Sequence, residues 1–239
     1  MCGRVVRTTP QHLVAEYFGI NDDGPEVEPS YNIAPGANLL GVFAGGPAKR
    51  NLTRFRWGLI PSWAKDPAIA YKLINARAET VAEKPAYRAA FKARRCLIPV
   101  DGFYEWKREG GGKVPFFLQM RDERLFSLAG LWEWWRPKEG KAVESCTVIT
   151  TEPNDVLRPI HDRMPVIVSP TDFERWLDPM NQNVDELKSL LRPYPPDEMT
   201  ARQVSRHMNN PRNNGPECIQ AIDVRQAIKG VQNACKRVK

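Results

Sequence analysis

The side chains that could do chemistry begin with Cys2, which directly follows Met1. Removal of Met1 would leave an N-terminal cysteine, with an amine of pKa about 8 and a thiol of pKa about 8.5 on adjacent carbons. Such an aminothiol can capture an aldehyde: the amine condenses to an imine, and the thiolate then closes a thiazolidine ring. The alternative is a small buried residue at the start of a strand, since free cysteine is among the most buried residue types.

A second candidate group lies on a strand-like stretch at residues 72–80. Alternation along a strand places Asn75, Arg77 and Glu79 on one face. Such a face is often simply solvated in antiparallel sheets. In the functional alternative it lines the floor of a pocket, where Asn75 orients a nucleophile and Arg77 holds a phosphate.

Glu105 and His161 are the candidate proton-transfer groups. Glu105 stands between Tyr104 and Trp106, and a carboxylate among aromatic rings is partly desolvated, which raises its pKa. His161 precedes Asp162 in a loop, and histidine titrates near neutral pH. Both also have ordinary explanations: Glu105 as a surface residue of an amphipathic strand, and His161 as a structural histidine paired with Asp162.

Basic residues alternate with tryptophans in the segment 54–65, which includes Arg54, Arg56, Trp57, Trp63 and Lys65. Single-stranded nucleic acid binds to such surfaces, because bases stack on aromatic rings and phosphates meet cations. The whole chain is basic, with 35 Lys and Arg against 28 Asp and Glu and a net charge of +7. An excess of positive charge favours polyanionic partners.

Several classes of protein are not indicated by the sequence. The five cysteines form no CxxC pair and no two of the three histidines have ligand spacing, so neither a disulfide framework nor a metal site is expected. Phosphate-binding glycine motifs are missing, so no nucleotide cofactor is expected. With no membrane-spanning apolar run and no signal peptide at the N-terminus, we expect a cytoplasmic protein that does not bind membranes.

The elements that must position these residues are mostly short strands separated by turns. We expect strands at 2–6, 38–43, 52–57, 71–77, 96–106, 114–121, 125–134, 146–150, 165–168 and 200–205. Helices are expected at 9–18, 84–94, 154–160, 171–177 and 184–191. The pattern predicts a single α+β domain over residues 1–222, with a curved, barrel-like, mostly antiparallel β core and short peripheral helices. A basic C-terminal appendix follows at 223–239.

An ordered set of motifs runs through the chain. They are Met1–Arg4, Tyr31–Gly36, Trp57–Trp63, Asn75–Thr80, Asp101–Trp106, Ile160–Pro165, Val204-Ser205 and Asn209–Arg212. In this order and spacing, from Cys2 to about Ile222, the chain resembles the SRAP family, the abasic-site processing proteins first called SOS response-associated peptidases. The resemblance implies a compact α+β fold with a curved sheet.

The resemblance also implies a function and a role for each matching residue. Members bind abasic sites in single-stranded DNA, often at fork junctions, and shield the lesion through a thiazolidine link to the N-terminal cysteine. The implied roles are Cys2 as nucleophile, Asn75 positioning it, Glu105 and His161 handling protons, Arg4, Arg77 and Arg163 holding phosphates, and Trp63 and Pro35 contacting the DNA. Self-removal of Met1 underlies the peptidase name, and lyase chemistry is a side branch. We expect a monomer, associated with the nucleoid in a bacterium.

Two other classes of function compete with this interpretation. An N-terminal-nucleophile amidohydrolase, such as a glutamine-dependent amidotransferase, also begins Met-Cys-Gly, and glutaminase activity would identify it. A non-enzymatic single-stranded DNA-binding module would explain the basic and aromatic segment but leaves Cys2, Glu105 and His161 without a role. DNA binding that is reversed by salt and leaves no covalent product would identify such a binding module. A Cys–His protease fits least, because a free N-terminus adds nothing to its chemistry.

Overall fold

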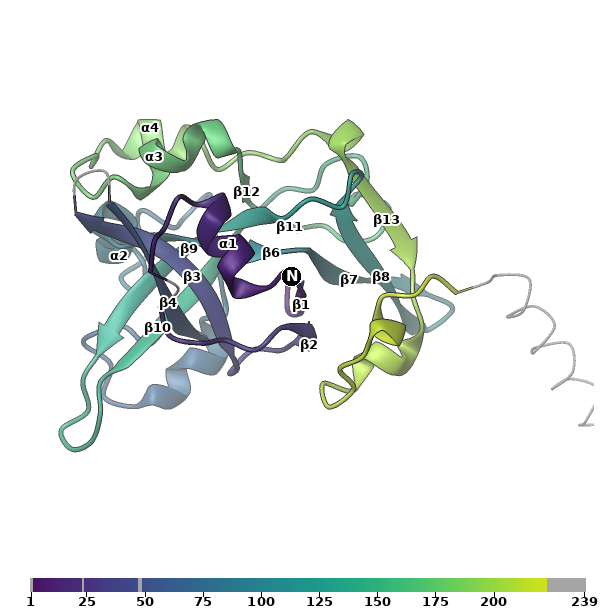
Figure 1. Ribbon diagram of the computed structural model, residues 1–239, viewed down its shortest axis with the longest axis horizontal. Helices are drawn as coiled ribbons and strands as arrows, with labels where there is room; N and C mark the ends of the chain where they lie inside the picture. The colour runs from purple at the N-terminus through teal and green to yellow at the C-terminus, as the bar shows by residue number, and fades with distance from the viewer. Residues whose placement is uncertain (1, 23, 47–48, 223–239) are drawn as a thin grey trace, which may run out of the picture.

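The computed structural model describes residues 2–22, 24–46 and 49–222. The basic appendix predicted at residues 223–239 lies outside the described residues. Two β-sheets form the core of the described chain, and the helices are short (Figure 1). The predicted α+β domain with a curved, mostly antiparallel β core and short peripheral helices is confirmed.

The larger sheet contains a closed barrel. Its strands are β3 (Asn38–Gly46), β4 (Lys49–Trp57), β6 (Arg95–Val100), β9 (Phe126–Trp135) and β10 (Val143–Thr151). The ring closes because β10 pairs with both β9 and β4, and the β4–β10 pair is the parallel one among these neighbours. Closure leaves these strands no open edge. Three short strands extend the sheet: β5 (Asn75–Arg77), β11 (Met164–Pro165) and β12 (Ile167–Val168).

The second sheet is entirely antiparallel and carries the N-terminus. Its order is β13 (Met199–Gln203), β8 (Gly112–Met120), β7 (Gly102–Glu109), β1 (Val5–Arg7) and β2 (Ser30–Ile33). The strand predicted at 96–106 is therefore two strands, β6 in the barrel and β7 in this sheet. The break falls at Asp101, whose carboxylate accepts a hydrogen bond from the Thr9 backbone N–H at 2.8 Å and so directs the chain from one sheet to the other.

Helices cover the outside of the sheets. The α-helices are α1 (Gln11–Tyr17), α2 (Arg88–Ala93), α3 (Phe173–Leu177) and α4 (Val184–Ser189). The 3₁₀ turns are η1 (Pro67–Lys72), η2 (Pro170–Asp172), η3 (Pro196–Glu198), η4 (Arg206–Asn209) and η5 (Pro216–Cys218). Helices α3 and α4 lie together over the barrel half of the molecule, and β13 lies in the other half (Figure 1).

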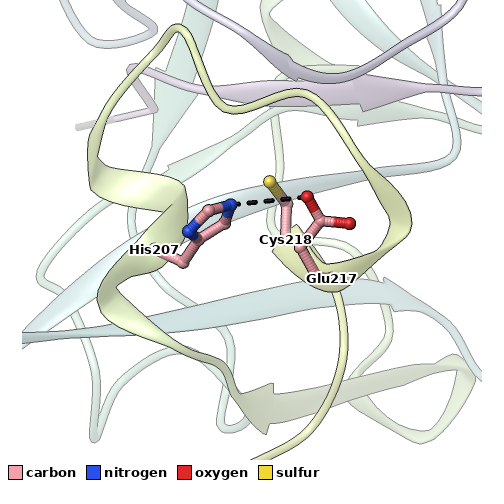
Figure 2. Close-up of side chains that lie close together, drawn as sticks. All are labelled: His207, Glu217 and Cys218. Carbon is pink, nitrogen blue, oxygen red and sulfur yellow. Dashed lines mark ion pairs between the residues drawn. The ribbon is translucent and has the colours of Figure 1, made fainter.

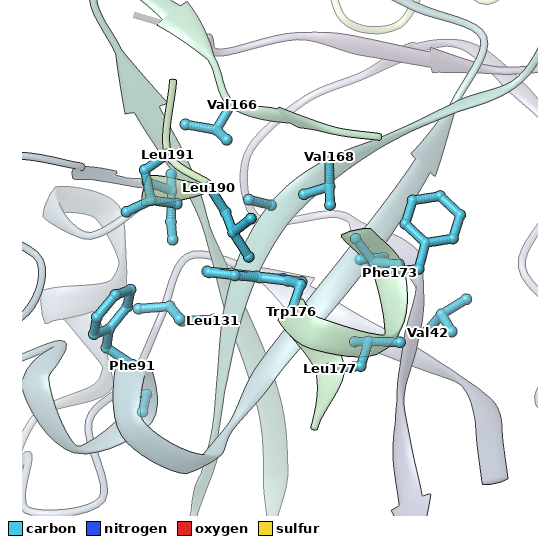
Figure 3. Packing of buried hydrophobic residues seen from close by; sticks show 14 of the residues in the cluster. Val42, Phe91, Leu131, Val166, Val168, Phe173, Trp176, Leu177, Leu190 and Leu191 are labelled. Atoms are coloured by element: carbon cyan, nitrogen blue, oxygen red, sulfur yellow. The ribbon is translucent and has the colours of Figure 1, made fainter. Parts of the chain in front are cut away.

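Buried aromatic side chains join the helices to the barrel. Trp176 of α3 is fully buried and donates a hydrogen bond from Nε1 to the Cys96 carbonyl of β6 at 2.9 Å. Its indole packs against Phe91 of α2, with ring centroids 6.2 Å apart, within a cluster of aliphatic side chains (Figure 3). Complete burial of a side chain of this size contributes about 2–3 kcal/mol to folding.

Three further local predictions were wrong. The strand expected at 71–77 is the 3₁₀ turn η1 followed by β5, because Asp66 caps the turn by accepting a bond from the Ala68 N–H at 2.8 Å. The helix expected at 154–160 is a run of turns, in which Asn154 Oδ1 accepts a bond from the Leu157 N–H at 3.1 Å. The strand expected at 165–168 is split into β11 and β12.

Candidate active site between two basic pockets

Sheet register brings Cys2 next to Glu105. Strand β1 pairs with β7 in antiparallel fashion, with Val5 opposite Phe103, so residues before Val5 run alongside residues after Phe103. The Tyr104 backbone N–H donates to the Arg4 carbonyl at 3.0 Å, which continues this pairing towards the N-terminus. Cys2 is completely buried at the end of this ladder.

Asn75 holds the cysteine from the barrel side. Its Nδ2 donates to the Cys2 carbonyl oxygen at 2.7 Å. The Asn75 backbone is itself fixed, because β5 pairs with β10 and the Tyr87 hydroxyl donates to the Asn75 carbonyl at 3.1 Å. A third bond, from Trp57 Nε1 to the Ile74 carbonyl at 2.9 Å, secures the preceding residue. The hydrogen bond from Asn75 to the Cys2 carbonyl is therefore consistent with the predicted role of Asn75 in positioning Cys2.

Glu105 and His161 face one another beside the cysteine. His161 Nε2 lies 3.8 Å from Glu105 Oε2, and the Glu105 side chain is 1% exposed. The Arg163 backbone N–H donates to His161 Nδ1 at 3.0 Å, so in the neutral ring the proton is on Nε2, on the side of Glu105. Asp162 Oδ1, 2.9 Å from Nδ1, favours the protonated ring, but burial is the larger effect and lowers the pKa of His161.

Burial disfavours the charged forms of both Cys2 and Glu105. It raises the pKa of the Cys2 thiol well above its usual range, and the negative charge of Glu105 adds to the increase. Burial also raises the pKa of Glu105 from 4.5 to about 7. The thiol is therefore not ionised by its surroundings, and it needs a base. A carboxyl group that titrates near neutral pH can both donate and accept a proton there.

The first of two basic pockets opens beside this carboxyl group. We call it the Glu105 pocket; it has a volume of about 880 Å³. Glu105, His161 and Asp162 lie in its wall. Its other charged residues are all basic: Lys107, Arg108, Lys113 and Arg158. The cations suit a phosphate backbone, and the carboxyl group and imidazole can move protons.

The second pocket lies on the Asn75 side. We call it the Trp63 pocket; it has a volume of about 550 Å³ and is bordered by Asn75 and Tyr87. Its charged residues are Lys72, Arg77 and Lys84, with no carboxylate among them. Trp63 is 59% exposed at this pocket, which leaves a ring face open for stacking.

Three of the predicted DNA-binding residues, Arg4, Pro35 and Arg163, line neither pocket. Arg4 donates to Asn32 Oδ1 at 2.6 Å and to the Met208 carbonyl at 3.0 Å, which ties the N-terminal strand to the C-terminal turns. Pro35 is half-buried in the turn between β2 and β3. Phosphate or DNA contact by these two residues remains a prediction.

Arg163 is already engaged by the protein. Its guanidinium donates to both carboxylate oxygens of Glu79, at 2.6 and 3.0 Å, and to the Thr150 carbonyl at 2.6 Å. Hydrogen bonding to Arg163 lowers the pKa of Glu79. In this arrangement Arg163 supports the backbone that orients His161, and a phosphate would have to compete with Glu79 for it.

Sequence reasoning missed several residues that surround the site. Tyr87 supports Asn75 and borders the Trp63 pocket, but a single tyrosine in a presumed helix carries no signal for this role. The lysines and arginines of the Glu105 pocket come from β7, β8 and the turn before His161, so only the fold brings them together.

In the part of the chain that the structure describes, the one cluster of three metal-ligating side chains is His207, Glu217 and Cys218, which includes none of the site residues above. No helix among the described residues is long and apolar enough to cross a membrane.

Comparison with known proteins gives one consistent result. The family model for SOS response associated peptidase (SRAP) matches residues 1–211. The chain is 47% identical over 224 residues to the abasic site processing protein YoqW of Bacillus subtilis, covering 92% of this chain and 100% of that protein. It is 35% identical to the abasic site processing protein HMCES of Xenopus tropicalis, covering 85% of this chain and 69% of that protein. A crystal structure of a Bacteroides thetaiotaomicron protein superposes with a TM-score of 0.84 at 28% identity, covering 92% of this chain and 100% of that one. The protein therefore belongs to the SRAP family.

Proposed function

We propose that this protein binds abasic sites in single-stranded DNA and, once Met1 is removed, forms a thiazolidine cross-link through Cys2 that shields the lesion during the DNA damage response. The observation that carries the proposal is the meeting of Cys2 with Asn75, Glu105 and His161 beside two basic pockets. Relatives named as abasic site processing proteins point to the same substrate.

The first steps convert the closed sugar into an imine. Glu105 relays the hydroxyl proton of C1′ to the ring oxygen, which opens the hemiacetal to an aldehyde. The Cys2 amine adds to C1′ to give a carbinolamine. His161 donates its Nε2 proton to the departing hydroxyl, water leaves, and the nitrogen gives up a proton in return. The tautomer set by the Arg163 backbone N–H presents that Nε2 proton on the Glu105 side.

Ring closure depends on removing the thiol proton. The pKa of Cys2 is raised by burial, so Glu105 in its carboxylate form is the base that takes the proton. The sulfur then bonds to C1′, and the imine nitrogen accepts a proton to become the ring amine. The net change is an aldehyde plus an aminothiol giving a thiazolidine plus one water. Asn75 holds the Cys2 carbonyl throughout, which limits the motion of the reacting residue.

The decisive experiment compares the wild-type protein with Cys2→Ala on a single-stranded oligonucleotide with one abasic site. We expect wild type to give an adduct that survives denaturing electrophoresis, with an intact mass equal to protein without Met1 plus DNA minus water. Cys2→Ala should give no such adduct while still binding the oligonucleotide. An adduct that persists in Cys2→Ala would refute the mechanism. Salt-reversible binding with no covalent product from wild type would favour the binding-module alternative, and glutaminase activity the amidohydrolase.

The same groups suit two further reactions. Removal of Met1 requires attack on the peptide bond before Cys2, and we propose that Cys2, Glu105 and His161 carry this out as a self-processing peptidase. The imine intermediate also acidifies the neighbouring carbon of the sugar, which permits β-elimination and hence lyase activity. Intact mass of Glu105→Gln separates self-processing from a host aminopeptidase: Met1 stays on the variant if the protein removes it, and is lost if another enzyme does.

A further inference from the structure

Three side chains of different chemistry converge in the C-terminal turns, apart from the residues of the proposed reaction. His207 comes from η4, and Glu217 and Cys218 come from η5 (Figure 2). His207 Nε2 lies 3.4 Å from Glu217 Oε1, and the ligand atoms of all three residues lie within 4.8 Å of one another. The thiol is buried, whereas the imidazole and carboxylate are open to solvent.

We propose that His207, Glu217 and Cys218 bind a divalent transition metal of the zinc type. A thiolate, an imidazole and a carboxylate together suit Zn²⁺, whereas Mg²⁺ and Ca²⁺ take oxygen ligands. With Zn–N and Zn–O bonds of about 2.0 Å, a tetrahedral site separates its nitrogen and oxygen ligands by roughly 3.3 Å. The His207–Glu217 separation of 3.4 Å already matches that edge. Three protein ligands leave the fourth position to water.

The surrounding turn holds the ligands near one another before any metal binds. Cys218 Sγ donates to the Asn213 carbonyl at 3.5 Å, and Asn213 Nδ2 donates to the His207 carbonyl at 2.7 Å. The same amide lies 3.2 Å from His207 Nδ1. When the metal takes Nε2, the ring proton resides on Nδ1, so the contact of Nδ1 with the Asn213 amide is given up while the bond from Asn213 Nδ2 to the His207 carbonyl is kept. The thiol gives up its proton to solvent as the metal–sulfur bond forms.

A metal at this site would link η4 to η5, and the segment between them holds the N-terminal strands. Asn32 Nδ2 donates to the Met208 carbonyl at 3.0 Å and to the Asn213 carbonyl at 2.7 Å, between the two metal-binding segments. Arg4 donates to Asn32 Oδ1 and to the same Met208 carbonyl. A metal that binds the folded turn and not the unfolded chain stabilises the folded state by mass action. This inference does not depend on the proposed DNA chemistry.

The test is titration of the full-length, metal-free protein with Zn²⁺ by calorimetry and with Co²⁺ by absorption spectroscopy. We expect one equivalent of Zn²⁺ to bind and to raise the melting temperature, and Co²⁺ to give a sulfur-to-metal charge-transfer band. Cys218→Ser and His207→Gln should each weaken binding by at least about 100-fold, the upper range for loss of a mere outer-shell partner. His207 is exposed, so its variant tests the site even if Cys218→Ser fails to fold.

Cys2 needs its own control, because a free N-terminal aminothiol also chelates metals. The titrations are therefore repeated in Cys2→Ala, with His12→Gln as a matched change of an exposed histidine on α1. Metal binding kept in Cys2→Ala and in His12→Gln but lost in His207→Gln supports the site. Binding lost in Cys2→Ala but kept in His207→Gln, or no binding of Zn²⁺ at millimolar concentration, would overturn it.

Discussion

The two basic pockets, one lined by Glu105 and the other by Asn75, resemble each other in charge but differ in what else they contain. The Trp63 pocket combines three cations with an exposed indole and has no carboxylate in its wall. The Glu105 pocket combines four cations with Glu105, His161 and Asp162. The first therefore has the composition of a binding surface, and the second has both binding and proton-transfer groups. Substitutions on the two sides are expected to affect different steps, binding on one and covalent reaction on the other.

The largest expected effect is on the reaction rate at the Glu105 pocket. Compared with wild type after Met1 has been removed from both proteins, Glu105→Gln keeps the size of the side chain but removes the acid and base, so adduct formation should slow by at least about 100-fold. The dissociation constant for abasic DNA should change by no more than about twofold, since no cation is altered. Single-turnover kinetics at saturating DNA and fluorescence anisotropy measure the two quantities. Equal losses in rate and affinity would contradict the division between the pockets.

Burial of the same carboxyl group should also appear in folding stability. The folded protein holds the Glu105 proton up to about pH 7, whereas the unfolded chain releases it near 4.5, so ionisation opposes folding as the pH rises through this range. Relative to wild type, Glu105→Gln should therefore gain stability between pH 5 and pH 8, by up to about 3 kcal/mol. Urea unfolding at the two pH values measures this. Glu109→Gln, at the exposed end of the same strand, should show no such gain.

A smaller effect is expected on the Trp63 side. Trp63→Ala removes a stacking surface, which is worth about 1–3 kcal/mol per base, so affinity should fall about 5-fold to 150-fold. At saturating DNA the rate of cross-linking should remain near that of wild type. Trp134→Ala is the matched control, since Trp134 is also exposed but lines neither pocket and stacks with Arg136. A comparable loss of affinity in both variants would remove the case for a specific stacking site.

The smallest effect should come from a single cation. Lys84→Gln removes one charge from the Trp63 pocket, so the slope of log affinity against log salt should become shallower by about 0.7 for single-stranded DNA. Lys141→Gln, an exposed lysine outside both pockets, should leave the slope unchanged. Equal slopes for Lys84→Gln and wild type would mean that Lys84 binds no phosphate.

Local chemistry made the central residues predictable from sequence. A carboxylate between Tyr104 and Trp106 signalled burial and a raised pKa, and both are found. Alternation placed Asn75 and Arg77 on one face, and both line the Trp63 pocket. The family motifs and the β-rich fold were likewise recognised from the order of short segments. A monomeric state and a cytoplasmic location remain predictions.

Contacts between distant segments were beyond the reach of sequence patterns. The engagement of Arg163 by Glu79, and of Arg4 by Asn32, depends on how the sheets meet, and it changes what these arginines do in the free protein. The convergence of His207 with Glu217 and Cys218 likewise depends on a turn closed by Asn213, and no metal-binding spacing marks it. Local errors, such as the strand expected where Asp66 caps η1, arose where a single side-chain cap outweighed strand propensity.

The hydrogen bond from Asn75 to the Cys2 carbonyl has a consequence for the removal of Met1. That carbonyl belongs to the bond between Cys2 and Gly3, so excision of Met1 leaves it untouched. The newly made chain can therefore fold with the Cys2 amine still in peptide linkage to Met1 and with the Cys2 carbonyl already bonded to Asn75. In the proposed reaction, removal of Met1 then frees the Cys2 amine without breaking this hydrogen bond.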